Sequence, residues 1–203
     1  MNRSRHVTAY RVPLACEAAP HLGCCTLAKP VLCEIENQTT AVGAWLNRDG
    51  TVLAVVWPHT TDYLQSADQL LQILRRHGLT ASELAQSEQT DALKDFGSRD
   101  DWYRPTELNR LSDQEARIIA ARMVNRLRMK IAIGPDQTQL LVTAITEACA
   151  STLPNASATC ASDRRDEIAA AILTAARAVL NNVSFAVLAD AVALGHRPLL
   201  GED

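Results

Sequence analysis

The fold is decided by residues 42–57, which read VGAWLNRDGTVLAVVW. Two short runs of β-forming residues, Val42–Asn47 and Thr51–Trp57, flank the segment Arg48-Asp49-Gly50. Aspartate followed by glycine is a strong signal for a tight turn between two strands. These residues therefore predict a β-hairpin, and the other elements are placed around it.

Two elements are predicted before the hairpin. Residues 6–15 partly alternate and predict a strand that ends near Pro13. A loop, residues 16–25, follows. From Thr26 onward the apolar residues recur at helical spacing. Proline is tolerated only in the first turn of a helix, so this helix is expected to begin just before Pro30.

After the hairpin, Ser66 is expected to cap a second helix that ends at His77-Gly78. Residues 79–84 fit either a short final strand or the start of another helix. The resulting order, βαββα(β), is typical of a ferredoxin-like domain, predicted for residues 1–85. Residues 86–105 are polar and predict a linker with one short helix.

The remaining residues, 106–203, predict an all-α helical bundle, so that the fold class of the chain is α+β. A capping box, Ser112 to Glu115, opens the first helix, which runs to about Ile131. The next helix spans about residues 135–152. Asp163 and Ser184 are expected to cap the last two helices.

The composition limits the classes of function. Of the 203 residues, 47% are hydrophobic and 21% charged, as expected for a packed core. The net charge of −3 makes nucleic acid an unlikely partner, because nucleic-acid-binding proteins usually carry a positive surplus. No secretory signal follows the basic N-terminus, and polar residues interrupt the most apolar stretch, 168–194. A cytoplasmic protein without a membrane partner is therefore expected.

Cysteine clustering is the least ordinary feature of the chain. Four of the six cysteines lie within residues 16–33. Thiolates are soft ligands suited to Cu(I), Hg(II) or Zn(II). The predicted metal site contains Cys16, Cys24 and Cys25, and His21 could add a nitrogen ligand. Cys16 with either Cys24 or Cys25, or all three thiolates together, would each be a reasonable ligand set.

The plainer alternative is that a free cysteine is only a small buried hydrophobic residue. This is the expectation for the three cysteines outside the loop, which are Cys33, Cys149 and Cys160.

Gly23-Cys24-Cys25, followed by a helix, a β-hairpin and a helix ending in His77-Gly78, resembles the heavy-metal-associated domain. That family includes copper chaperones, metal-pumping ATPases and mercury-binding proteins, and the resemblance covers roughly residues 6–84. In the family, a Gly-Met-x-Cys-x-x-Cys loop joins the first strand to the first helix. Here the two cysteines are adjacent, and only Cys24 and Cys25 fall on the metal loop. The resemblance implies a ferredoxin-like fold and a soft-metal ligand.

Two other classes of function remain open from the sequence. A thiol-dependent enzyme, acting on a metal or an organometal, would use Cys24 or Cys25 as nucleophile. His21 or His59 would then be the base, and Asp62 or Glu17 would orient it.

A metal-responsive regulator is the other class. Arg122 and Arg126 share one face of a predicted helix that also carries Arg117, Arg128 and Lys130, and such a row could contact phosphates. The alanine-rich helices could form a homodimer or bind a protein partner. The function we expect is soft-metal handover, sequestration or sensing, as in copper or mercury resistance.

Overall fold

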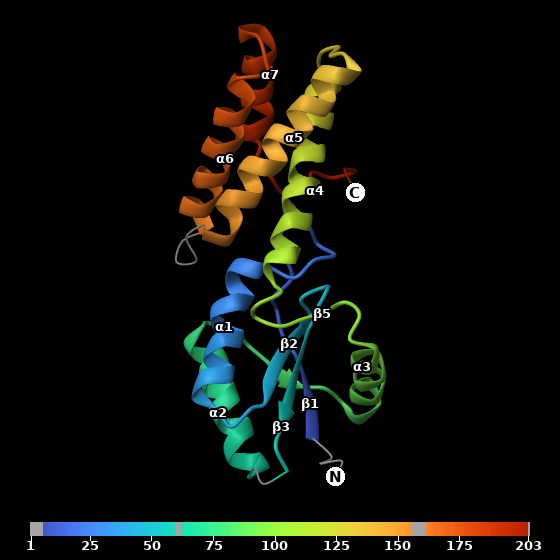
Figure 1. Ribbon diagram of the computed structural model, residues 1–203, viewed down its shortest axis with the longest axis vertical. Helices are drawn as coiled ribbons and strands as arrows, with labels where there is room; N and C mark the ends of the chain where they lie inside the picture. The colour runs from blue at the N-terminus through green and yellow to red at the C-terminus, as the bar shows by residue number, and fades with distance from the viewer. Residues whose placement is uncertain (1–5, 60–61, 156–160, 203) are drawn as a thin grey trace. The chain divides into compact units, whose positions relative to one another are not determined.

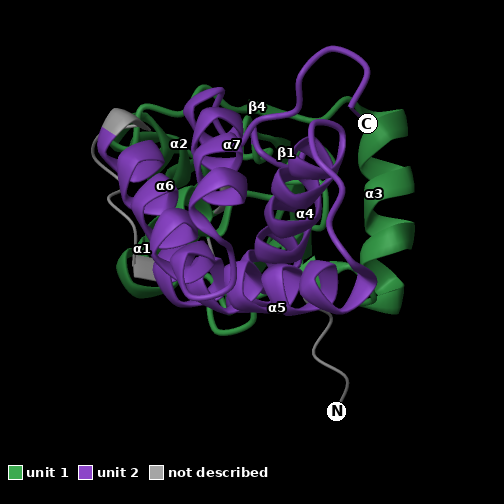
Figure 2. Cartoon of the chain, turned by 90° about the horizontal axis from the view of Figure 1, so that it is seen from above, with its two compact units in different colours: residues 1–16, 20–108 green, residues 17–19, 109–203 purple. Residues whose placement is uncertain are grey.

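The computed structural model describes residues 6–59, 62–155 and 161–202. The chain forms two compact units, which Figure 2 shows in different colours. Unit 1 consists of Met1–Cys16 and Pro20–Leu108, and unit 2 consists of Glu17–Ala19 and Asn109–Asp203. Unit 1 is a mixed helix and sheet structure, and the helices of unit 2 follow it in the chain, so the α+β class is confirmed.

Unit 1 is built on a sheet that has five strands within the described residues. They are β1 (His6–Arg11), β2 (Gly43–Asn47), β3 (Val52–Trp57), β4 (Ser82–Glu83) and β5 (Trp102–Tyr103). Their order is β4-β1-β3-β2-β5, and every neighbouring pair is antiparallel. The predicted strand within residues 6–15 and the short strand within residues 79–84 are thus both present.

The predicted hairpin is confirmed. β2 pairs with β3 so that Trp45 lies opposite Ala54. Gly50 has a φ of 72°, in the left-handed region that favours glycine. The Asn47 side chain closes the turn, because its Oδ1 accepts hydrogen bonds from the backbone N–H groups of Thr51, at 2.9 Å, and Val52, at 2.8 Å.

The sheet as a whole is not the predicted four-stranded ferredoxin-like sheet. β5 lies beyond β2 and adds a fifth strand. Residues 86–105, predicted as a linker with one short helix, form α3 (Gln86–Ser98) and β5. Aromatic packing favours this arrangement: Phe96 stacks edge-on against Trp45, at 5.3 Å between ring centroids, and against Trp102, at 5.0 Å. The polar composition of residues 86–105 gave no indication of these two contacts.

Helices cover both faces of the sheet (Figure 1). α1 (Cys25–Gln38) and α2 (Tyr63–Arg76) pack together on one face, and α3 lies on the other. α1 begins at Cys25, earlier than the predicted start just before Pro30, so Pro30 lies beyond the first turn. Proline lacks the N–H that would bond to the carbonyl oxygen of Thr26. Burial of the apolar face of α1 outweighs that loss, since Ala28, Val31 and Leu32 are all buried.

The cap predicted for α2 is also corrected. Asp62, not Ser66, is the N-cap, and its carboxylate accepts from the N–H groups of Leu64 and Gln65. Ser66 is buried inside the helix. The helix ends as predicted, with His77 as the C-cap and Gly78 at a φ of 71°.

Within its described residues, unit 2 contains four α-helices. They are α4 (Asn109–Arg128), α5 (Pro135–Thr152), α6 (Ala161–Arg177) and α7 (Asn182–Ala193), with one 3₁₀ turn at Leu153–Asn155. Each helix contacts the next, and α4 also contacts α7, so the four close on one another as a bundle. The predicted helical content of residues 106–203 is thereby confirmed. In the described part of the chain, no helix is both long and apolar enough to cross a membrane.

Three predicted caps in unit 2 are wrong. Asp163 lies in the first turn of α6, because that helix begins earlier, at Ala161. Ser112 lies inside α4 and is fully buried, because the helix begins earlier, at Asn109. Asn181, not Ser184, caps α7, and its Oδ1 accepts a hydrogen bond from the Ser184 N–H at 2.9 Å. Ser112 and Ser184 are both buried inside their helices, and this burial could not be seen from the local sequence.

Candidate functional site

The cysteine-bearing loop is a short hairpin, and all of its cysteines belong to unit 1. Ala15 and Gly23 form an isolated antiparallel bridge. The Cys16 N–H donates to the Leu22 carbonyl oxygen, and the Cys24 N–H donates to the Leu14 carbonyl oxygen, both at 2.7 Å. The backbone positions of Cys16 and Cys24 are therefore fixed relative to each other by two hydrogen bonds.

Two glycines fix this hairpin to the β2–β3 turn. A Cβ atom added at Gly23 would lie 3.2 Å from the Gly50 Cα, and one added at Gly50 would lie 2.6 Å from the Gly23 Cα. The backbones can approach this closely only because neither residue has a side chain. The Leu14 N–H also donates to the Gly50 carbonyl oxygen at 2.9 Å. The loop is thus anchored to the central hairpin of the sheet.

The three predicted thiol ligands are all buried. Cys16 belongs to the hairpin, Cys24 is the N-cap of α1, and Cys25 is its first residue. His21, the predicted nitrogen ligand, is exposed at the tip of the loop. Within the described ranges, no group of three or more His, Cys, Asp or Glu side chains could hold a metal ion. The site that combines all three thiolates with His21 therefore stays a prediction.

The other cysteines follow the plainer expectation where they are described. Cys149 is buried, and burial together with the nearby charge of Glu115 raises the pKa of its thiol to about 12. Cys33 is half-buried in α1. Cys160 lies outside the described residues.

The acids proposed for a thiol enzyme have other partners. Asp62 caps α2, as described above. Glu17 is in unit 2, where its carboxylate pairs with Arg197. His59 lines a groove of about 1050 Å³ in unit 1, between α3 and the ends of β1 and β3. The structure thus gives Asp62 and Glu17 other roles and places His59 at the groove.

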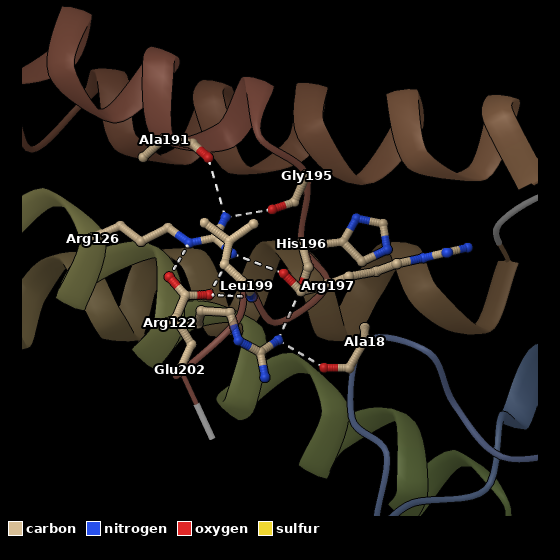
Figure 3. A network of polar contacts seen from close by, with 9 residues as sticks. All are labelled: Ala18, Arg122, Arg126, Ala191, Gly195, His196, Arg197, Leu199 and Glu202. Carbon is tan, nitrogen blue, oxygen red and sulfur yellow. Dashed lines mark hydrogen bonds and ion pairs between the residues drawn. The ribbon is translucent and has the colours of Figure 1, made fainter.

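Arg122 and Arg126 do not form the solvated or phosphate-contacting row that the sequence suggests. Their relative exposures are only 9% and 6%. Arg126 donates from Nη1 to the carbonyl oxygen of Gly195 at 2.5 Å and from Nη2 to that of Arg197 at 2.8 Å. It also forms a two-point ion pair with Glu202 (Figure 3). Both guanidinium groups are therefore engaged inside unit 2.

Arg122 holds the same segment from its other side. Its Nη1 donates to the carbonyl oxygens of Ala18, at 2.7 Å, and His196, at 2.8 Å (Figure 3). Two buried cations thus fix residues 195–202 against α4. Burying an arginine is costly unless its donors are satisfied, and carbonyl oxygens supply that here.

Next to this network lies a cavity of about 300 Å³ that sequence analysis missed. Its lining includes Arg164 and Arg165 of α6 and His196 and Arg197 of the segment after α7. Burial lowers the pKa of His196 to about 4, and the positive charges of Arg164 and Arg165 act in the same direction. The only sequence signal was the pair of adjacent arginines, which gives no indication that His196 lies beside them.

Comparisons with protein-family models, with curated proteins and with solved structures find no match for this chain.

Proposed function

We propose that this protein binds one soft metal ion through the thiolates of Cys16 and Cys24. The single observation that carries this proposal is the hairpin formed by Ala15 and Gly23. The two-thiolate site is a narrower form of the site expected from the sequence, and it needs neither Cys25 nor His21.

The register of the hairpin favours Cys16 with Cys24 over the other pairs. In the bonded register, Cys16 lies opposite Leu22, and Leu22 is two residues from Cys24. Residues opposite each other share a face of a β-ladder, as do residues two apart. Cys16 and Cys24 are thus diagonal neighbours on one face. Cys25 is the first residue of α1, so its backbone is helical and it does not belong to the face of the hairpin shared by Cys16 and Cys24.

The spacing suits an ion between two sulfur atoms. Diagonal neighbours are about 7–8 Å apart at Cα and closer at Cβ. A thiolate–metal bond of about 2.3 Å places two opposed sulfur atoms about 4.6 Å apart. Cu(I) and Hg(II) accept two thiolates, whereas Zn(II) in structural sites takes four ligands. We therefore favour Cu(I) or Hg(II) over Zn(II).

The surroundings of the pair fit metal handover or sequestration in a reducing compartment such as the cytoplasm. Both residues are buried. The glycine contact between Gly23 and Gly50 holds the hairpin in place before an ion arrives. A pre-formed pair of positions lowers the ordering cost of binding.

The test is titration of the reduced full-length protein with Hg(II), and with Cu(I) under a competing chelator. We expect one ion per chain and a thiolate-to-metal charge-transfer band. Cys16→Ser and Cys24→Ser should each abolish tight binding. Cys25→Ser is the matched control, because it removes an equally buried neighbouring thiol, and it should retain one ion. Retained stoichiometry in both Cys16→Ser and Cys24→Ser would refute the proposal.

A further inference from the structure

A second, separate site is indicated by the 300 Å³ cavity of unit 2. It lies between the beginning of α6 and the segment that follows α7. Arg164 and Arg165 line one side, and Gly195, His196 and Arg197 line the other. Glu17, which follows Cys16 in the loop, also lines this cavity, but none of the cysteines does. The two proposals therefore rest on different ligand groups and can be tested separately.

The charged groups of the lining are mostly positive. Arg164, Arg165 and Arg197 contribute three guanidinium groups, and Glu17 contributes one carboxylate, which pairs with Arg197. Among the residues that line the cavity, positive charges thus outnumber negative ones by two, although the chain as a whole has a net charge of −3. Arg165 is held at the cavity, because its Nη2 donates to the Ala193 carbonyl oxygen at 2.9 Å.

The far wall of the cavity is held rigidly. Arg126 bonds to the carbonyl oxygens of Gly195 and Arg197, and Arg122 bonds to that of His196 (Figure 3). All three consecutive residues of this wall are thus fixed by buried donors on α4. A ligand that enters would not have to order this segment, which favours binding.

The lowered pKa of His196 is consistent with a positive electrostatic potential in this cavity. Burial is the main cause of its lowered pKa of about 4, and the charges of Arg164, Arg165, Arg122 and Arg126 follow. The imidazole is therefore neutral at pH 7. Glu17, which lines the cavity, pairs with Arg197, and Glu202 pairs with Arg126. An added anion would be attracted, and an added proton is repelled.

We propose that this cavity binds a phosphate group, either free or carried by a small phosphomonoester. Arginine is the residue best suited to this ligand, because its planar fork of N–H donors matches two phosphate oxygens at once. A dianion also balances the surplus of two charges. The volume is at the lower end of the range for ligand pockets, which fits a small molecule.

The test is an NMR titration of the full-length protein at pH 7, with inorganic phosphate and, separately, glycerol phosphate, at constant ionic strength set with chloride. The His196 ring signal is identified by its absence in His196→Gln. We expect this signal to shift saturably, and its pKa to rise when phosphate is bound, because the anion offsets the arginine charges. Comparing the two ligands tells which source of phosphate is preferred, and tighter binding of either supports the proposal.

Variants sharpen the result. The double variant Arg164→Gln with Arg165→Gln should weaken phosphate binding by at least tenfold. Arg128→Gln is the control for net charge, because Arg128 is exposed on α4 and does not line the cavity. The proposal is overturned if phosphate gives no saturable shift of His196 in the wild-type protein, if Arg128→Gln weakens binding equally, or if acetate binds as tightly as phosphate. The wild-type titration decides the matter even if the double variant does not fold.

Discussion

Arg126 and Glu202 lie 76 residues apart in the sequence and form a two-point ion pair, with Nε–Oε1 at 2.7 Å and Nη2–Oε2 at 2.6 Å. The planar guanidinium presents two parallel donors to the carboxylate, the strongest geometry for such a pair. The pairing also lowers the pKa of Glu202 to about 2. The Arg126 side chain is only 6% exposed and that of Glu202 is 21% exposed, so solvent reaches the pair only from the carboxylate side.

Replacing Arg126 by lysine should destabilise unit 2 although the charge is kept. Lysine cannot supply forked donors to Glu202 and to the carbonyl oxygens of Gly195 and Arg197 at the same time. We expect a loss of about 2 kcal/mol or more in the free energy of unfolding. Arg128→Lys, an exposed position on the same helix, should change it by less than about 0.5 kcal/mol. Urea denaturation followed by far-UV circular dichroism measures both, and equal effects would contradict the role given to Arg126.

His196 should make stability depend on pH. Its folded-state pKa is about 4, below the usual 6.5. Between these values the unfolded state binds a proton that the folded state does not, so stability falls as the pH decreases from 6.5 and levels off below 4. From pH 7.5 to 5.5 we expect His196 to account for a loss of about 1 kcal/mol. His196→Gln should remove this part of the loss in urea denaturation at the two pH values. If the wild-type protein and His196→Gln lose the same free energy of unfolding between these two pH values, the prediction is contradicted.

Gly50 and Gly78 form a matched pair for testing the glycine contact. Both residues have a positive φ, of 72° at Gly50 and 71° at Gly78. A Cβ atom added at Gly50 would meet the backbone of Gly23, whereas a Cβ atom added at Gly78 would meet nothing within 4 Å. Gly78→Ala should cost about 1 kcal/mol from backbone strain. Gly50→Ala should cost about 3 kcal/mol or more, because the two hairpins must also separate. Urea denaturation followed by tryptophan fluorescence, which reports on Trp45, Trp57 and Trp102 of unit 1, distinguishes them. Equal losses of unfolding free energy in Gly50→Ala and Gly78→Ala would show that the contact between Gly23 and Gly50 leaves room for a Cβ atom.

Asn181 should be the functional cap of α7. Asn181→Ala removes the oxygen that accepts from the Ser184 N–H and should cost about 1 kcal/mol. Asn182→Ala, one residue later and exposed, is the control and should be nearly neutral. Thermal unfolding followed by circular dichroism measures the difference, and a larger effect at Asn182 would place the cap there instead.

The thiols should differ sharply in reactivity. Cys149 is buried with a thiol pKa of about 12, so little thiolate forms at pH 8. Cys33 is only half-buried. N-ethylmaleimide at pH 8 should therefore modify Cys33 in the folded protein and Cys149 only after unfolding. Peptide mass spectrometry gives the order, and early modification of Cys149 would contradict its burial.

Local signals in the sequence were enough for much of the fold. The Asp49-Gly50 turn and the apolar spacing of the helices predicted the hairpin and the helical second half. What failed depends on contacts between distant residues. Phe96 packs on Trp45 and Trp102 across the sheet, so a polar segment that resembles a linker becomes a helix and a strand. Similarly, Pro30 is tolerated inside α1 because the apolar face of that helix is buried.

The candidate sites show the same division. The cluster of cysteines was visible in the sequence, but the choice of Cys16 with Cys24 required the register of the hairpin. The cavity around His196 was not predictable, because Arg164 lies on α6 whereas His196 lies in the segment after α7. Arg122 and Arg126 looked like a surface row, since spacing along a helix does not tell which face is covered.

The buried position of Arg126 also has a consequence for synthesis of the chain. Its carboxylate partner, Glu202, is translated 76 residues later. At typical rates of about 5–20 residues per second, that interval is roughly 4–15 s. Through this time the guanidinium has no counter-charge at its final position and is better hydrated than buried. We therefore expect α4 to form early on the ribosome but to dock only after Glu202 has been synthesised, which makes unit 2 the later of the two units to fold.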